Sequence, residues 1–394
     1  SDVYKRQSEE SILHTYNRFP VVFEKGQGCY LYDSEGKEYL DFAAGIAVNS
    51  LGYHYPGYDE ALKDQIDKLM HISNLYYNEP IIEAGAKLVK ASKMSKAFFT
   101  NSGTEAIEGA LKAAKKYAYV RDGHADHEII AMNHSFHGRS IGALSVTGTA
   151  HYREPFEPLM GGVKFADFNN LESVKAQITD KTCAIITEVV QGEGGIYPAK
   201  KEFLEGLRQI CDEKDIMLIF DEIQCGMGRT GHYFAWQAYG VQPDIMTSAK
   251  ALGCGVPVGA FVLSEKAAKA SLEPGDHGTT YGGNPFVCAA VSKVFDIYKN
   301  DKIIEHVQEM TPYLEQKLDE IVAKHECAAT RRGMGFMQGI VIQGRPVGEV
   351  VKAALAKGLL VISAGSDVLR IVPPLVITKE HIDKMAAILD ECME

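Results

Sequence analysis

The stretch that decides the fold runs from residue 216 to residue 260 and reads IMLIFDEIQCGMGRTGHYFAWQAYGVQPDIMTSAKALGCGVPVGA. Its first five residues, Ile216–Phe220, form a branched apolar run that is too short for a helix and typical of a buried strand. Two carboxylates, Asp221 and Glu222, follow directly. A second predicted strand, Asp244–Ser248, leads into Lys250 and a glycine-rich loop, GCGVPVG. Because ligands bind at the carboxyl ends of strands in open α/β sheets, we expect Asp221 and Lys250 to face one crevice.

This pair of a carboxylate and a lysine admits two interpretations. A salt bridge between two loops is the simpler one, and exposed pairs of this kind contribute little to stability. The glycines after Lys250 favour the other, because they let the backbone approach a ligand where a lysine would otherwise be mobile and solvated. A lysine held in a crevice suits Schiff-base chemistry, and pyridoxal phosphate enzymes pair such a lysine with an acid at the ring nitrogen.

A competing motif lies inside the same stretch. Residues 226–231, GMGRTG, match the G-x-G-x-x-G fingerprint of dinucleotide-binding proteins. In those proteins the fingerprint follows its strand directly and opens a helix. Here the residues DEIQC separate the strand from the first glycine. The sequence therefore disfavours a dinucleotide site.

Composition and charge exclude several classes of partner. The chain has 394 residues, enough for two domains, and a formal net charge of −11, which disfavours nucleic acid and anionic membranes. It has no apolar run near the ~18 residues that a membrane span needs, and its first residues lack the apolar core of a secretory signal. Eight scattered cysteines without a C-x-x-C pair indicate reduced thiols. We therefore expect a cytoplasmic protein.

A strand-to-helix turn is predicted near residue 100. The run Lys96–Phe99 is typical of a strand, and a helix with an apolar face begins after the residues NSGTE at positions 101–105. Ser102 and Glu105 fit a capping box, which requires no ligand. The same turn presents free backbone N–H groups and hydroxyls that suit a phosphate at a helix N-terminus. From these residues alone the two interpretations are equally good.

Histidines gather around the predicted strand Glu128–Met132, at positions 124, 127, 134 and 137. They suggest a metal site, but their separations fit no standard ligand motif. The segment NHSFHGR instead places Phe136 and Arg139 after the strand. An aromatic ring and an arginine there suit stacking on a ring and binding of a carboxylate. We therefore predict no metal.

Strands and helices alternate along the middle of the chain. A predicted strand, Cys183–Val190, leads into QGEGG and then into a helix that returns to the strand at residue 216. Such alternation predicts an α/β fold with a mostly parallel sheet flanked by helices. The tail, with the apolar runs MQGIVI, LLVIS and VLRIVP, suggests a smaller α+β unit. We expect an N-terminal segment (1–56) that joins this unit, a large domain (57–284) and a C-terminal small domain (285–394).

Taken together, these motifs resemble the class III (subgroup II) pyridoxal-phosphate aminotransferases, and among them most closely the acetylornithine aminotransferases. The similarity runs from about Thr15 to the C-terminal helix. It rests on seven motifs in the family's order: NSGTEA, FHGR, QGEGG, FDEIQCGMGRTG, PDIMTSAKALG, GDHGTTYGGNP and LRIVPPL. The resemblance implies the type I fold of pyridoxal-phosphate-dependent transferases, in which GMGRTG binds no dinucleotide.

The resemblance also implies how the chain holds its cofactor, pyridoxal 5'-phosphate. Lys250 would form the Schiff base with the cofactor, and Asp221 would keep the ring nitrogen protonated. Gln224 would bond to the ring hydroxyl, and Phe136 would stack on the ring. The phosphate would be bound by Ser102, Gly103 and Thr104, together with Thr280 of the neighbouring subunit, which implies a homodimer with shared sites.

Further positions would bind the substrate. Arg139 and Arg370 resemble the two arginines that hold substrate carboxylates, with Glu193 as a gate on Arg370. Tyr16 stands where the family has an aromatic residue at the substrate entrance. Gly45-Ile46 stands where ornithine aminotransferases usually carry a bulky tyrosine, which leaves room for an acylated amine.

The activity that the resemblance implies is transfer of the terminal amino group of N-acetyl-L-ornithine to 2-oxoglutarate. The products would be N-acetyl-L-glutamate 5-semialdehyde and L-glutamate, in arginine biosynthesis. Succinylornithine, N-succinyl-diaminopimelate, ornithine and 4-aminobutyrate are alternative donors, because the sequence does not reveal the acyl pocket. An aminomutase, which needs no 2-oxoglutarate, is an alternative of another enzyme class. A non-catalytic binding protein is disfavoured because Lys250 and Asp221 are both present.

Overall fold

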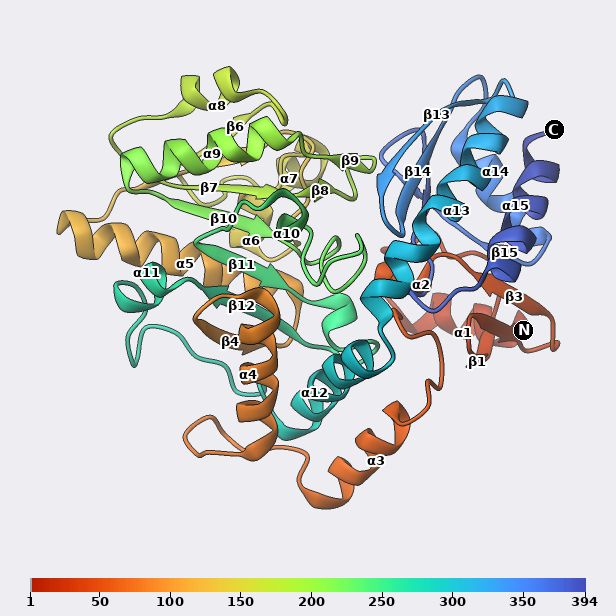
Figure 1. Cartoon of the computed structure of the whole chain (residues 1–394), viewed down its shortest axis with the longest axis horizontal. Coiled ribbons are helices and arrows are strands. Elements are labelled where there is room, and N and C mark those ends of the chain that lie inside the picture. Colours follow the sequence, from red (N-terminus) through yellow and green to blue (C-terminus); the bar gives the residue numbers. More distant parts are fainter. Residues whose placement is uncertain (1) are drawn as a thin grey trace.

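The structure, a computed structural model, describes residues 2–394 and is built around a seven-stranded sheet (Figure 1). In spatial order its strands are β4 (Lys96–Thr100), β12 (Gly259–Leu263), β11 (Ile245–Ser248), β10 (Met217–Asp221), β7 (Thr182–Glu188), β5 (Glu128–Met132) and β6 (Val163–Ala166). Only β12 runs antiparallel to its neighbours within this sheet. The predicted mostly parallel sheet is confirmed.

The central strands are buried on both faces, because successive side chains of a strand point to opposite sides of the sheet. Ile219 of β10 lies in one apolar core with the buried face of α5 (Gly103–Asp122). Phe220, the next residue, lies in a second core with the buried face of α9 (Lys201–Lys214). The two helices therefore cover opposite faces of the sheet, which explains why these strands are continuous apolar runs in the sequence.

Shorter elements complete this part of the chain. They are α3 (Tyr58–Lys68), α4 (Glu79–Ser92), α6 (Ile141–Ser145), α7 (Ala150–Arg153), η1 (Glu154–Phe156), α8 (Leu171–Gln177), β8 (Val190–Gln191), β9 (Tyr197–Pro198), α10 (Trp236–Tyr239), η2 (Lys250–Leu252) and α11 (Glu265–Lys269). After them, α12 (Pro285–Asn300) packs against α3 and α4.

The two ends of the chain form a second unit beside the large sheet (Figure 1). One of its sheets contains β13 (Ala328–Met334), β14 (Met337–Ile342), β17 (Val368–Ile371) and β16 (Ile362–Ala364), and another joins β1 (Phe23–Gln27), β2 (Tyr30–Asp33) and β3 (Glu38–Asp41) to β15 (Leu359–Leu360). Its helices are α1 (Asp2–Ser11), α2 (Ala44–Ala47), α13 (Ile303–Lys324), α14 (Val347–Ala356) and α15 (Lys379–Met393). The parallel pairing of β3 with β15 joins the N-terminal strands to the C-terminal part. The domain limits at residues 56 and 284 stay a prediction.

The GMGRTG segment connects the two units. Arg229 is fully buried, and its Nη1 donates to the carbonyl oxygens of Phe336, at 3.2 Å, and Pro373. The carbonyl oxygen of Arg229 accepts the N–H of Phe336 at 2.8 Å. Gly228 and Gly231, at φ of +84° and +87°, allow the left-handed turns on either side. This structural use accounts for a motif that the sequence shares with nucleotide-binding loops.

The structure can be compared with the expectations about membrane-spanning segments and about the state of the cysteines. Within residues 2–394, no helix combines the length and the apolar character needed to cross a bilayer. The eight cysteines, all in the described part of the chain, are free thiols, and seven of them are buried.

Candidate active site

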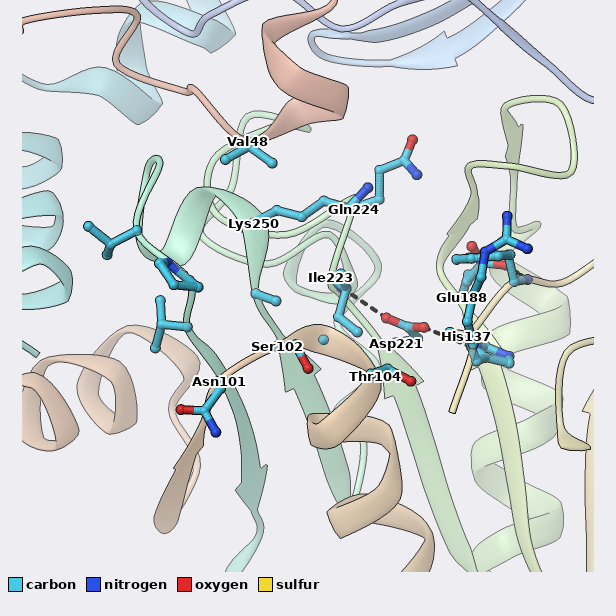
Figure 2. A pocket seen from close by; sticks show the side chains of 18 of the residues that line it. Val48, Asn101, Ser102, Thr104, His137, Glu188, Asp221, Ile223, Gln224 and Lys250 are labelled. Atoms are coloured by element: carbon cyan, nitrogen blue, oxygen red, sulfur yellow. Dashed lines mark hydrogen bonds and ion pairs between the residues drawn. The ribbon is translucent and has the colours of Figure 1, made fainter. Parts of the chain in front are cut away.

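A cavity of about 490 Å³ lies where β10 and β11 end, beside the N-terminus of α5 (Figure 2). Its lining includes eight of the residues assigned from the sequence: Ser102, Gly103, Thr104, Phe136, Arg139, Asp221, Gln224 and Lys250. The structure thus brings Asp221 and Lys250 together in one crevice at the carboxyl edge of the sheet.

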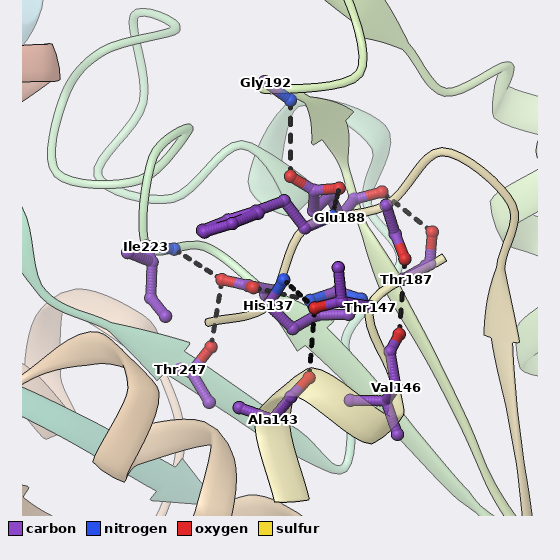
Figure 3. A network of polar contacts seen from close by, with 12 residues as sticks. His137, Ala143, Val146, Thr147, Thr187, Glu188, Gly192, Ile223 and Thr247 are labelled. Carbon is purple, nitrogen blue, oxygen red and sulfur yellow. Dashed lines mark hydrogen bonds and ion pairs between the residues drawn. The ribbon is translucent and has the colours of Figure 1, made fainter. Parts of the chain in front are cut away.

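Asp221 ends β10 and is labelled in Figure 2. Three donors, from Ile223, Thr247 and His137, hold its buried carboxylate, and Figure 3 labels all three residues. Oδ1 accepts from the N–H of Ile223 at 3.0 Å and from the hydroxyl of Thr247 at 3.2 Å. Oδ2 lies 2.7 Å from Nδ1 of His137. Because a carboxylate only accepts, Nδ1 of His137 carries the proton of this bond. The orientation of Asp221 is therefore fixed, and its charge suits a protonated ring nitrogen in the cavity.

Glu188 is a second buried carboxylate at this edge, and the sequence analysis did not assign it. The strand register aligns it with Asp221 across β7 and β10. Its carboxylate oxygens accept the backbone N–H groups of Phe136 and Gly192, each at 3.3 Å. Burial, and then the charge of Asp221, raise the pKa of Glu188 well above its usual value. Glu188 therefore links the ring-stacking candidate Phe136 to the QGEGG loop.

Lys250 opens η2 directly after β11, in a left-handed conformation at φ +49°. Such backbone strain in a residue other than glycine costs about 1–3 kcal/mol and is concentrated at functional sites. Burial lowers the pKa of the Lys250 ammonium to about 8, although the carboxylate of Glu193 acts in the opposite direction. About a fifth of this amine is therefore neutral at pH 7.4 and available as a nucleophile, far more than for an ordinary lysine.

The N-terminus of α5 forms the floor of the cavity. Ser102 caps the helix, with its hydroxyl accepting the N–H of Glu105 at 3.3 Å. The prediction of a full capping box is wrong, because its second hydrogen bond does not form. The side chain of Glu105 accepts the N–H of Asn101, at 2.7 Å, instead of that of Ser102. The first N–H groups of a helix have no acceptor inside the helix, and here they border a cavity. This geometry suits an anion such as phosphate.

Phe136 and Arg139 lie on the other side of the cavity. The guanidinium of the exposed Arg139 lies 5.6 Å from the ring centroid of Phe136 and 4.6 Å from that of Tyr152. The rings of Phe136 and Tyr152 meet edge to face at 5.7 Å. Tyr152, which the sequence analysis did not assign, thus supports both side chains.

Arg370, from β17, approaches from the second unit and is tied to Glu193. Nη1 lies 2.6 Å from one Glu193 oxygen, and Nη2 lies 3.3 Å from the other. Nη1 also donates to Oε1 of Gln224 at 3.1 Å. Burial raises the pKa of Glu193, but the charge and hydrogen bonds of Arg370 outweigh it and lower the pKa overall. The Nε of Arg370 is buried and has no hydrogen-bond partner among the described residues.

Besides Glu193 and Arg370, which do not line this cavity, the assigned residues Tyr16, Thr280 and Ile46 lie outside it. Tyr16 is 69% exposed, and Thr280 is exposed on the loop before α12. Ile46 lines a neighbouring cavity of about 1010 Å³, which also reaches Arg370. Glu222 follows Asp221 but turns away from the site, and its carboxylate accepts the N–H groups of Ala235 and Trp236 at 2.8 Å each.

Comparison of the chain with known proteins identifies its family. The family described as Aminotransferase class-III matches residues 12–393. The chain belongs to the class-III aminotransferases. It is 47% identical, over 98% of its length and 100% of the relative, to an acetylornithine aminotransferase of Clostridium acetobutylicum. It is 43% identical, over 97% of its length and 94% of the relative, to a succinylornithine transaminase of Yersinia pseudotuberculosis.

Solved structures of aminotransferases share the fold of this chain. An ornithine aminotransferase from Toxoplasma gondii, described with partial occupancy of PLP at its active site, superimposes with a TM-score of 0.95. It is 28% identical, and the match covers 100% of this chain and 93% of that one. The predicted fold and the predicted enzyme class, a pyridoxal-phosphate-dependent aminotransferase, are confirmed.

The cavity of this class-III aminotransferase fits pyridoxal phosphate. Asp221 offers a fixed carboxylate, Lys250 an amine of lowered pKa, and the start of α5 a place for a phosphate. Gly103 leaves the helix start bare on the cavity side, where an added Cβ would lie 2.9 Å from the side chain of Ile223. The residues present thus match a flat cationic ring with a phosphate arm.

The lowered pKa of Lys250 predicts how the apoprotein takes up the cofactor. Only the neutral amine attacks a carbonyl group, so the rate of covalent attachment should rise with pH, with a midpoint near 8, whereas an ordinary lysine has a pKa of 10.5. Glu193 raises the pKa of Lys250, so Glu193→Gln should move the midpoint to lower pH. Stopped-flow absorbance after mixing apoprotein with pyridoxal phosphate measures both. A midpoint near 10 would contradict the assigned burial.

Proposed function

We propose that the enzyme transfers the terminal amino group of N-acetyl-L-ornithine to 2-oxoglutarate, giving N-acetyl-L-glutamate 5-semialdehyde and L-glutamate in arginine biosynthesis in the cytoplasm. The observation that carries the proposal is the pairing of Lys250 and Asp221 in one cavity of a chain similar over its whole length to acetylornithine aminotransferases. The need for 2-oxoglutarate as acceptor distinguishes this activity from that of an aminomutase.

The residues around the cavity divide the chemical work. When bound, pyridoxal phosphate supplies a conjugated ring that accepts electrons from the substrate carbon. Asp221 would hold the ring nitrogen protonated, and His137 and Thr247 keep its carboxylate in place. The Nζ amine of Lys250 would carry the cofactor and, when free, would move a proton at the substrate carbon. Ser102, Gly103 and Thr104 would hold the phosphate, Gln224 would bond to the ring hydroxyl, and Phe136 would stack on the ring.

The two arginines give the site its carboxylate specificity. Arg139, which is exposed at the cavity, binds the α-carboxylate of the donor, and the exposed Tyr16 supplies an aromatic ring at the substrate entrance. Arg370 binds the second carboxylate of glutamate and 2-oxoglutarate. The donor has a neutral methylene there, so Glu193 neutralises Arg370 in the first half-reaction and moves aside in the second. The contact of Glu193 with Arg370 supports the closed state of this gate.

A succinylated donor is the second candidate, and one observation favours it. The neighbouring cavity of about 1010 Å³, which reaches both Ile46 and Arg370, has cations in its lining: Arg18, Lys37 and Lys352. These cations suit a terminal carboxylate, which a succinyl group carries and an acetyl group lacks. A succinylornithine transaminase is also among the relatives.

The site is completed in a homodimer. An apolar surface over α3 and the loop after it includes Leu75, 86% exposed, and Tyr77, 95% exposed. Exposed apolar patches of this kind mark protein interfaces. Tyr281, next to Thr280, lies against this surface, with its ring 5.2 Å from that of His71. In the homodimer that we propose, two copies pair through this surface and Thr280 of each chain serves the phosphate site of the other.

Donor preference tests the proposed substrate. We expect kcat/KM with 2-oxoglutarate as acceptor to be higher for N-acetylornithine than for ornithine. Gly45 and Ile46 both have a φ of +64°. Tyrosine would add left-handed strain at the glycine, whereas at Ile46 it would replace a side chain that already has this strain, so Ile46→Tyr is the better way to fill the acyl pocket. This variant should lower kcat/KM for N-acetylornithine more than for ornithine, whereas Ile46→Leu should change neither much. A preference of the unchanged enzyme for ornithine would reject the proposal.

Separate half-reactions test the gate. A charge-assisted hydrogen bond is worth about 1.5–3 kcal/mol, which alters a rate ratio by about 10 to 150-fold. Glu193→Gln should therefore increase, by a factor in this range, the rate with glutamate relative to the rate with N-acetylornithine. Stopped-flow measurement of each half-reaction gives the ratio. Equal losses in both half-reactions would mean that Glu193 is a structural ion pair.

Mixed dimers test the sharing of sites. Thr280→Ala should weaken cofactor affinity by about 10 to 150-fold if its hydroxyl bonds to a charged phosphate. Mixing Thr280→Ala chains with Lys250→Ala chains should restore one complete site in each heterodimer and hence recover activity at low cofactor concentration. The control mixes Thr280→Ala chains with the double variant, which forms no complete site. Equal activity in the two mixtures would show that sites are not shared.

A further inference from the structure

A compact group of three ligand-type side chains lies at the C-terminal end of α5, away from the active site. Asp122, His124 and His127 belong to the segment DGHADH, and one ligand atom of each lies within 4.8 Å of the other two. α5 has 20 residues and so spans about 30 Å, with the phosphate-binding candidates at its other end. The active site therefore makes no use of this group.

We propose that Asp122, His124 and His127 bind a divalent transition-metal ion of the Zn²⁺ class. Imidazole nitrogens with a carboxylate oxygen are ligands that Zn²⁺, Ni²⁺ and Cu²⁺ prefer over Mg²⁺ and Ca²⁺. Of the four histidines around β5, His124 and His127 thus form the proposed site. Their spacing in the sequence did not indicate it, because only the turn after the helix brings them together. The other two lie apart: His137 is bonded to Asp221, and His134 is exposed.

The backbone holds the three side chains in place. Gly123 caps α5 in the left-handed conformation at φ +73°, and its N–H donates to the carbonyl oxygen of Tyr119 at 2.9 Å. Asp126 also has a positive φ, +83°. These two turns fold the segment back on the helix end, where the rings of His124 and His127 stack at 5.1 Å. The partial negative charge of a helix C-terminus favours a cation there.

The hydrogen bonds prepare the ligands for a metal. Nδ1 of His124 lies 2.6 Å from the carbonyl oxygen of Ala125, which only accepts, so Nδ1 carries the proton and Nε2 keeps its lone pair. Nε2 of His127 lies 2.9 Å from Oδ2 of Asp122. Neighbouring ligand atoms of a tetrahedral zinc ion lie about 3.3 Å apart, so an ion needs only a small separation of this pair as it replaces the shared proton.

Arg121 is the main competitor for Asp122. Its Nε and Nη2 bond to the two carboxylate oxygens at 2.6 Å each. These charge-assisted hydrogen bonds from Arg121 favour the ionised carboxylate and hold the pKa of Asp122 well below its usual range. An ionised carboxylate has about four acceptor positions, so Asp122 can bind a metal while it keeps Arg121. The positive charge of Arg121 still opposes a cation, which the two imidazoles must outweigh.

Calorimetric titration of the tag-free holoenzyme with ZnCl₂ tests the site. We expect one equivalent to bind per chain, with no change in the visible absorbance of the cofactor. His124→Gln, which alters an exposed side chain, should weaken binding at least tenfold. The matched control is His325→Gln, because His325 makes the same kind of bond to Asp390, at 2.7 Å, beside Lys324. This control should bind zinc like the unchanged enzyme.

Two results would overturn the proposal. Either no saturable zinc binding is found, or zinc binds with equal affinity to His124→Gln and the unchanged enzyme. The thermal unfolding midpoint gives an independent measure, because an ion that binds the folded chain alone raises it. Added zinc should raise the midpoint of the unchanged enzyme and of His325→Gln. Added zinc should not change the unfolding midpoint of His124→Gln.

Discussion

The active site depends on the parallel alignment of β7, β10 and β11. In this register Glu188, Asp221 and Thr247 stand side by side at the carboxyl edge of the sheet. One neighbour donates a hydroxyl to Asp221, and the other fixes the backbone around Phe136. β12 runs antiparallel between β11 and β4, and Gly259 at its start lets the turn before α5 approach closely, since a Cβ there would lie 2.2 Å from the carbonyl oxygen of Ser102. The turn proposed to bind the phosphate is thereby held next to the lysine.

The site also concentrates features that are unfavourable for stability. Lys250 has a strained backbone and a buried amine, Glu188 is a buried acid beside another acid, and Arg370 is almost fully buried. Each costs free energy that the apolar cores on the two faces of the sheet must offset. Perturbed groups of this kind cluster at functional sites, because reactivity requires them. The surrounding strands, by contrast, have buried apolar side chains.

The sequence predicted those parts that depend on local pattern. The buried runs at β5, β10 and β11 were recognisable from their length and apolar character. Asp221 and Lys250 were predicted as site residues because they follow two of these runs. Glu188 could not be assigned in the same way, because its role depends on which strands are neighbours in the sheet. The side chain of Glu105 bonds to the N–H of Asn101 and not, as predicted, to that of Ser102. This difference of one residue depends on the exact path of the turn, which the sequence pattern does not specify. Thr280 and Tyr16 lie away from the cavity in a single chain, and their assigned roles stay predictions.

The assignment of the whole site depends on Lys250, which we propose carries the cofactor. Borohydride reduction of the holoenzyme, followed by digestion and mass spectrometry of the peptides, tests it most directly. We expect one pyridoxyl phosphate group per chain, on the peptide that contains Lys250, and none in the Lys250→Ala variant. Reduction that fixes the cofactor on a different lysine would contradict the assignment of the whole site.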